Sequence, residues 1–229
     1  MRNLSNGSRG ADVMFLQCLL NKKGARPRLV EDGVFGRHTH DAVVAFQQSN
    51  RVAPPNGTVG AGTWSKFGAI TERLHRVTPT SQSTDVSCWS AAATTILGDM
   101  SVGQGQAALL SDGELAAPID NIETFVQGLG WRLINNQSVP PASTLITGLQ
   151  RGPLWVAFQG RGFGHAVVFS GVYSDGANDA SATVFVVNDP WPPNSAAGTE
   201  YGTTYHNGQV LIRAVSPPQS AGIAYVAQP

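Results

Sequence analysis

One cysteine of this chain stands where a reactive thiolate can form. Cys88 opens the apolar segment 88–98, which predicts a helix that ends at Gly98. Backbone N–H groups and the helix dipole favour negative charge at a helix N-terminus and lower the pKa of a thiol placed there. A thiolate also needs a base partner to act as a nucleophile near neutral pH. Cys88 is therefore a candidate nucleophile, provided that a histidine lies beside it.

The candidate partners of Cys88 lie at the ends of predicted strands. His165 begins a strand after a glycine-rich turn, a place from which a side chain can face a cleft. Asp189 follows another strand and can orient and stabilise a protonated imidazole. Asn188 is the alternative third member, and only one of the two can serve because neighbouring strand residues point to opposite faces. His206 is the alternative base, although its neighbours indicate a loop.

A glutamine six residues before the cysteine adds a further group. The side-chain amide of Gln82 can donate a hydrogen bond to a developing oxyanion, beside the backbone N–H of Cys88. Three later blocks accompany this pattern: Gly152-Pro153-Leu154-Trp155-Val156, Gly164-His165-Ala166-Val167-Val168-Phe169-Ser170-Gly171-Val172 and Val186-Val187-Asn188-Asp189-Pro190-Trp191. Together these residues, within about 80–215, resemble the papain-like cysteine peptidases. The blocks resemble the bacterial branch, which includes bacteriocin-leader peptidases and papain-fold effector proteases.

The resemblance implies a role for each candidate residue. Cys88 would be the nucleophile, His165 the general base and acid, and Gln82 the oxyanion donor. Asp189 would orient the histidine, because an Asp-Pro pair is the bacterial pattern. Plant-type papains carry asparagine as the third member, which keeps Asn188 as the alternative.

The remaining chemical groups predict neither a cofactor nor a metal. Cys18 lies among leucines and is expected to be a buried core thiol, so the disulfide beside the active site of plant-type papains is missing. The fold therefore needs no oxidising compartment. His38 and His40 have no third ligand nearby in sequence and are expected to begin a solvated helix. No phosphate-binding loop, dinucleotide fingerprint or basic stripe is present, which argues against a nucleic-acid partner.

The elements that must position these residues change character along the second part of the chain. Helices are predicted first, and a run of hairpin strands follows, which is typical of an α+β domain. The predicted helices are 88–98, 119–128 and 142–150, and the predicted strands are 154–158, 165–173 and 183–187, with edge strands at 210–214 and 223–227.

The first part of the chain predicts a small all-α module. Apolar residues recur at helical spacing, and two similar turns, at 32–36 and 56–60, each precede a helix. The pattern comprises Leu4, Gly7, Gly10-Ala11-Asp12-Val13, Leu16-Gln17, Leu20, Gly24, Asp32-Gly33-Val34-Phe35-Gly36, Thr39, Ala42-Val43, Phe46-Gln47, Asn56-Gly57, Val59-Gly60 and Thr63-Trp64. It resembles the bacterial peptidoglycan-binding domain, the three-helix repeat of cell-wall hydrolases. That resemblance implies a shallow groove for wall peptide stems or glycan, without assigning individual contacts.

Charge supports a division into two domains. Residues 1–75 carry 10 Lys/Arg and 5 Asp/Glu, a balance of +5, whereas residues 76–229 carry 5 Arg and 10 Asp/Glu, a balance of −5. We expect a peptidoglycan-binding domain at 1–70, a linker at 71–81 and a papain-like domain at 82–229. The basic part suits an anionic partner. No apolar run approaches the ~18–20 residues that span a bilayer, and the sequence as given shows no secretory signal.

These expectations combine into a cell-wall-targeted cysteine hydrolase that cleaves amide bonds of peptidoglycan peptide stems or cross-links. The main alternative is a protease toxin or effector that cuts protein substrates, and a catalytically dead wall-binding protein is the third hypothesis. The expected partners are peptidoglycan, a peptide or protein substrate, and a secretion machine or an immunity or inhibitor protein. The expected setting is bacterial, with synthesis in the cytoplasm and action in the periplasm or at the wall after non-classical delivery or lysis.

Overall fold

The chain divides into two compact units, and each unit is built from three separate segments. The computed structural model describes residues 1–84, 87–98, 110–111, 114–115, 119–136, 138–159, 164–191, 202–214 and 223–229. Met1–Arg73, Val172–Phe185 and Tyr205–Val210 form the first unit. Leu74–Gly171, Val186–Thr204 and Leu211–Pro229 form the second. The layout is a helical N-terminal region followed by a mixed domain with an antiparallel sheet, as the sequence predicted.

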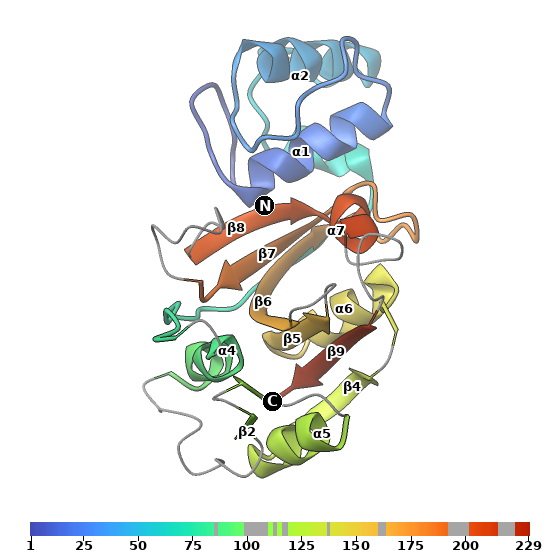
Figure 1. Ribbon diagram of the computed structural model, residues 1–229. Coiled ribbons are helices and arrows are strands. Elements are labelled where there is room, and N and C mark those ends of the chain that lie inside the picture. Colours follow the sequence, from blue (N-terminus) through green and yellow to red (C-terminus); the bar gives the residue numbers. More distant parts are fainter. Residues whose placement is uncertain are drawn as a thin grey trace. The chain divides into compact units, whose positions relative to one another are not determined.

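Three short helices make up the N-terminal region (Figure 1). They are α1 (Ala11–Lys22), α2 (Arg37–Ser49) and α3 (Ala61–Trp64), and the 3-10 helix η1 (Ser65–Phe67) follows α3 directly. Their core is aromatic: Phe46 stacks on Phe67 with ring centres 4.2 Å apart, and Phe15 stacks on Trp64 at 6.4 Å. Such pairs stabilise a small core beyond the apolar area that they bury.

The repeated turns are each held by a buried glutamine from the preceding helix. Gln17 in α1 accepts a hydrogen bond from Gly33 N (2.9 Å) and donates one to Val34 O (3.1 Å). Gln47 in α2 likewise accepts one from Gly57 N (3.0 Å) and donates one to Thr58 O (2.8 Å). Gly33 and Gly57 have φ of 70° and 75°, which favours glycine. The internal repeat therefore has the same polar scaffold twice.

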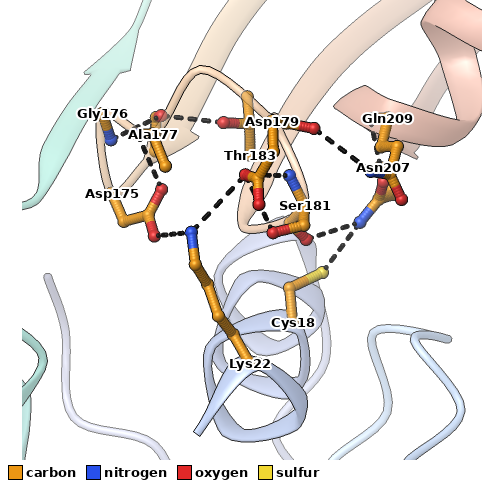
Figure 2. A network of polar contacts seen from close by, with 11 residues as sticks. Cys18, Lys22, Asp175, Gly176, Ala177, Asp179, Ser181, Thr183, Asn207 and Gln209 are labelled. Carbon is orange, nitrogen blue, oxygen red and sulfur yellow. Dashed lines mark hydrogen bonds and ion pairs between the residues drawn. The ribbon is translucent and has the colours of Figure 1, made fainter.

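The first unit also includes strand residues that come much later in the chain. Lys22 pairs with Asp175 at 2.7 Å, and Asn207 Nδ2 donates to Cys18 Sγ at 3.3 Å (Figure 2). Asn207 Nδ2 also donates to Glu31 Oε2 at 3.0 Å. Within the same unit, the ring of Phe15 stacks on that of Tyr173. These contacts join the helices to the end of a strand hairpin.

The main sheet carries the mixed domain. Among the described residues it has seven strands in the order β4-β9-β5-β6-β7-β8, and β1 pairs with β6 (Figure 1). Pairs β4–β9, β5–β9 and β5–β6 are antiparallel. The strands are β1 (Thr71–Leu74), β4 (Arg132–Asn136), β5 (Leu154–Gln159), β6 (Gly164–Ser174), β7 (Thr183–Asp189), β8 (Gly202–Asn207) and β9 (Ile223–Gln228); β2 (Leu110–Ser111) and β3 (Glu114–Leu115) form a separate pair.

The helices of the mixed domain pack a core against this sheet. They are α4 (Cys88–Leu97), α5 (Ile119–Gly128) and α6 (Ala142–Leu149), close to the predicted helices. Trp89 of α4 meets Phe125 of α5 edge to face at 5.2 Å, and Phe125 also packs on Trp155 of β5. These rings belong to one buried cluster. The residue after Cys88 is therefore fixed in the core, which orients the start of α4.

Several expected elements differ from the observed ones. The predicted edge strand at 210–214 was wrong: this segment is α7 (Gly208–Ala214), and Asn207 caps it by accepting hydrogen bonds from Gln209 N and Val210 N. β9 is a strand as predicted, but it lies between β4 and β5 and not at an edge. β4 and β8 were not predicted, and β1 lies in the segment expected to be a linker. The glycine-rich turn predicted before His165, at residues 159–164, lies largely outside the described residues.

No helix in the described part of the chain is long and apolar enough to cross a membrane.

Candidate active site

Cys88 lies at the first position of α4, where the sequence predicted it. The side chain is buried, with 8% of the residue exposed. The neighbouring Trp89 accepts a hydrogen bond at its carbonyl oxygen from the indole N–H of Trp155, at 3.0 Å. Because Trp155 is on β5, this bond ties the start of α4 to the sheet. β5 pairs with β6, and the register sets Phe158 opposite His165.

The candidate histidine and carboxylate are paired. His165 Nε2 lies 2.9 Å from Asp189 Oδ1. The side chain of Cys88 is within hydrogen-bonding reach of the same imidazole. Since Nε2 faces the carboxylate, Nδ1 is the ring atom left for the thiol. The structure thus brings Cys88, His165 and Asp189 into one group, from α4, the start of β6 and the end of β7.

The electrostatics of this group favour a protonated imidazole. Burial is the largest single contribution, and it lowers the pKa of His165. The hydrogen bonds to Asp189 and Cys88 and the charges of both residues raise the pKa, and together they outweigh burial. The net effect raises the pKa from 6.5 to about 9. At neutral pH the imidazole therefore carries a proton that it can give to a leaving group.

Two aromatic rings enclose the histidine. The rings of Phe158 and Trp191 both meet His165 edge-on, with ring centres 5.9 and 5.8 Å away. The backbone N–H of Trp191 also donates to Asp189 Oδ1 at 2.8 Å. The His165 side chain is only 11% exposed, and charge interactions are stronger where contact with water is reduced. Phe158 was not singled out from the sequence, although its place opposite His165 follows once the β5–β6 register is known.

Asn188 points away from this group. It donates to Ser170 Oγ at 2.7 Å and accepts from Thr203 Oγ1 at 2.8 Å, and only 4% of the residue is exposed. Neighbouring strand residues face opposite sides, so the two candidates for the third position are separated by the pleat of β7. Asp189, and not Asn188, is the residue that contacts His165.

Gln82 is buried next to the end of β7, where Asp189 is the last strand residue. Its backbone N–H donates to Pro190 O at 2.8 Å, which holds the segment before α4 next to the residue that follows Asp189. Its side-chain Nε2 donates to Thr84 O at 2.8 Å, and its Oε1 has no hydrogen-bond partner among the described residues. One amide hydrogen of Nε2 thus remains for an oxyanion.

The other candidate residues lie elsewhere. His206 lies in β8 and Cys18 lies in α1, and both residues belong to the first unit. Cys88, His165 and Asp189 belong to the second unit. The sequence indicated a loop at His206, and the structure has a strand there. Among the described residues, no group of three His, Cys, Asp or Glu side chains is arranged to hold a metal ion.

The two cysteines are expected to differ sharply in reactivity. Burial, helped by Glu31, raises the pKa of the Cys18 thiol to about 12, and 1% of Cys18 is exposed. Cys88 instead lies beside a protonated imidazole at a helix N-terminus. Iodoacetamide at neutral pH should therefore alkylate Cys88 more than about 100-fold faster than Cys18. Peptide mass mapping over time measures both rates, with urea-unfolded protein as the control in which both react. Equal rates in the native protein would contradict Cys88 as the reactive cysteine.

The structure places a thiol at a helix start, a histidine at the start of a strand and a carboxylate at the end of the neighbouring strand, which is the arrangement that the resemblance to papain-like cysteine peptidases implied. The comparison of families agrees: residues 73–205 match the family described as papain-like cysteine protease AvrRpt2, and this chain belongs to it. It is thus a hydrolase of the peptidase type.

The N-terminal region matches a second family model. Residues 9–67 match the putative peptidoglycan binding domain. A solved Burkholderia AP3 phage endolysin is 43% identical over 30% of this chain and 25% of its own, with a TM-score of 0.28. The SleB N-terminal domain is 33% identical over 29% of this chain and 88% of its own, with a TM-score of 0.27. The chain therefore spans about a quarter of the endolysin, whereas the match covers most of the SleB N-terminal domain.

Proposed function

We propose that this protein is a peptidoglycan-bound cysteine hydrolase that cleaves amide bonds in the peptide stems or cross-links of the bacterial wall. The observation that carries the proposal is the hydrogen-bonded group of Cys88, His165 and Asp189 in a chain that also contains a peptidoglycan-binding domain. The proposed boundaries are 1–70 for the binding domain, 71–81 for the connection and 82–229 for the peptidase domain.

The chemistry follows from the positions of the three side chains. The Cys88 thiolate attacks the carbonyl carbon of the amide, and the backbone N–H of Cys88 with the free amide hydrogen of Gln82 stabilises the oxyanion. Protonated His165 gives its proton to the leaving nitrogen, so that the C–N bond breaks and an amine departs. Water then attacks the thioester, passes a proton to His165 and breaks the C–S bond. A carboxylic acid leaves, and the thiolate–imidazolium pair is restored.

Asp189 is assigned a positioning and electrostatic role in this cycle. Its carboxylate holds Nε2 of His165, so that Nδ1 faces the thiol and the substrate. Its negative charge also stabilises the imidazolium form.

The binding domain would act by tethering. A weakly bound module raises the effective concentration of wall substrate around the peptidase and so speeds cleavage without taking part in the chemistry. The proposed place of action is the periplasm or the wall, reached by a dedicated secretion machine or by lysis, and an inhibitor protein would protect the producing cell.

A second candidate function is cleavage of protein substrates. The family match favours it, because that family is described as a protease. The wall domain would then serve passage or localisation.

One experiment separates the two candidates. Purified sacculi and a mixture of denatured proteins are each incubated with the full chain, and the products are analysed by mass spectrometry. We expect muropeptides that have gained one water at an amide bond and carry a new amino end. Cleavage of the protein mixture with intact muropeptides would reject the wall substrate and establish the second candidate. The Cys88→Ala protein is the control for contaminating hydrolases.

A further inference from the structure

A pocket of about 440 Å³ lies in the helical region, remote in sequence from the catalytic residues. One wall is a stripe along α2, formed by residues at helical spacing: His38, Asp41, Ala42, Ala45 and Ser49. The other wall is the segment that follows α1, residues 23–27. Pockets of this size accept small ligands or short peptide ends.

The floor of the pocket is apolar and made of small or buried groups. Leu20 and Phe46 are 2% and 8% exposed, and they line the pocket together with the methyl groups of Ala42 and Ala45. A floor of this kind offers contact for methyl-sized side chains.

The rim carries two cations that form no ion pair with any residue described in the structure. Four basic residues occur between 22 and 28, and two of them are used inside the unit: Lys22 pairs with Asp175, and Arg28 pairs with Glu31. The other two, Lys23 and Arg26, line the pocket, are exposed and form no ion pair within the part of the chain that the structure describes. They are therefore free to bind a carboxylate of a ligand by charge-assisted hydrogen bonds.

The single acid on the rim does not cancel this charge. Asp41 lies 3.8 Å from Arg37 Nε and 3.2 Å from His40 Nδ1, so it already has a cation and a ring nitrogen beside it. The pocket thus combines net positive charge with an apolar floor for small side chains.

We infer that this pocket binds the carboxylate end of a peptidoglycan peptide stem, and not the glycan strand. The inference rests on the proposed wall-binding function and names the part of the polymer recognised. Peptide stems end in alanine residues with a free carboxylate, whereas the glycan backbone offers hydroxyl and amide groups. Lys23 and Arg26 hold the carboxylate, and the alanine methyl groups contact Ala42, Ala45 and Phe46.

The test uses the full chain carrying Cys88→Ala, so that nothing is cut. Binding of a soluble stem tetrapeptide is measured by calorimetry, beside its C-terminal amide and a stem-free glycan oligomer. We expect the free acid to bind and the amide to bind at least about fivefold more weakly, because a charge-assisted contact is lost. Lys23→Ala and Arg26→Ala should each weaken binding about 3- to 10-fold.

Matched controls separate the pocket from general charge and shape. Lys66→Ala removes one positive charge from an exposed residue outside the pocket and should change the affinity less than twofold. Ala45→Trp fills the pocket without a charge change and should abolish stem binding, whereas Gln48→Trp, exposed on the same helix and outside the pocket, should not.

Three outcomes would overturn the inference: glycan that competes while the stem does not, equal losses for Lys66→Ala and Lys23→Ala, or stem binding that survives Ala45→Trp. If sacculi themselves are not bound, the proposed wall-binding function fails instead. Sacculus sedimentation with the same protein distinguishes that failure from failure of the pocket assignment.

Discussion

Replacing Cys88 by alanine is expected to abolish hydrolysis while leaving binding to cell walls unchanged. The thiolate forms the covalent intermediate, and loss of a nucleophile that works as a unit with its base costs about four orders of magnitude or more in kcat. The wall-binding match covers residues 9–67, which do not include the cysteine. Release of amines from sacculi measures the first effect, and sacculus sedimentation measures the second.

Cys18→Ala is the matched control for this variant. It removes the other thiol, which is buried in α1, so it should keep hydrolysis within about twofold unless folding suffers. Thermal unfolding of both variants reports on folding. Retained hydrolysis in Cys88→Ala would show that another residue is the nucleophile.

Asp189→Asn is expected to lower kcat/KM by about 10- to 100-fold. The amide keeps one hydrogen-bonding position near His165 but loses the charge that stabilises the imidazolium. The loss should be smaller than the ~10⁴-fold of the corresponding change in serine proteases, because the thiolate itself stabilises the protonated ring. Rates on one soluble substrate, with variant and wild type side by side, measure it.

Asn188→Ala is the neighbouring control. It removes hydrogen bonds to Ser170 and Thr203 inside the fold, so it should destabilise the protein by about 1–3 kcal/mol. Its effect on kcat/KM at a temperature where the protein is folded should be under about threefold. A crippled Asn188→Ala with an active Asp189→Asn would reverse the assignment of the third position.

Much of the fold was predictable because its patterns are local. The turn-and-helix repeat, the helix that begins at Cys88 and the strands that begin near residues 154, 164 and 183 all have periodic apolar residues and clear ends. The helix at Gly208–Ala214 was missed because Val-Leu-Ile is equally suited to a strand. Asn207, which caps this helix, was the available signal and was interpreted as part of a loop.

The site was predictable in its residue types but not in its contacts. The alternation rule required Asn188 and Asp189 to face opposite sides, yet only the register of β7 against its neighbours decides which one meets His165. Contacts such as Gln82 N–H to Pro190 O join residues far apart in sequence, and so do those between α1 and Asp175 or Asn207. These depend on tertiary packing that no local pattern encodes.

The pH dependence of kcat/KM tests the thiolate–imidazolium pair most directly. Because the pKa of His165 in the folded protein is raised to about 9, the imidazole keeps its proton through neutral pH and loses it as the pH rises through that value. Activity on a soluble peptide should therefore fall above about pH 9 in the wild type. In Asp189→Asn this descending limb should move to lower pH, because a charge that raises the pKa is gone. A descending limb near the ordinary histidine value in the wild type, or one that Asp189→Asn does not move, would contradict the pairing of Cys88, His165 and Asp189.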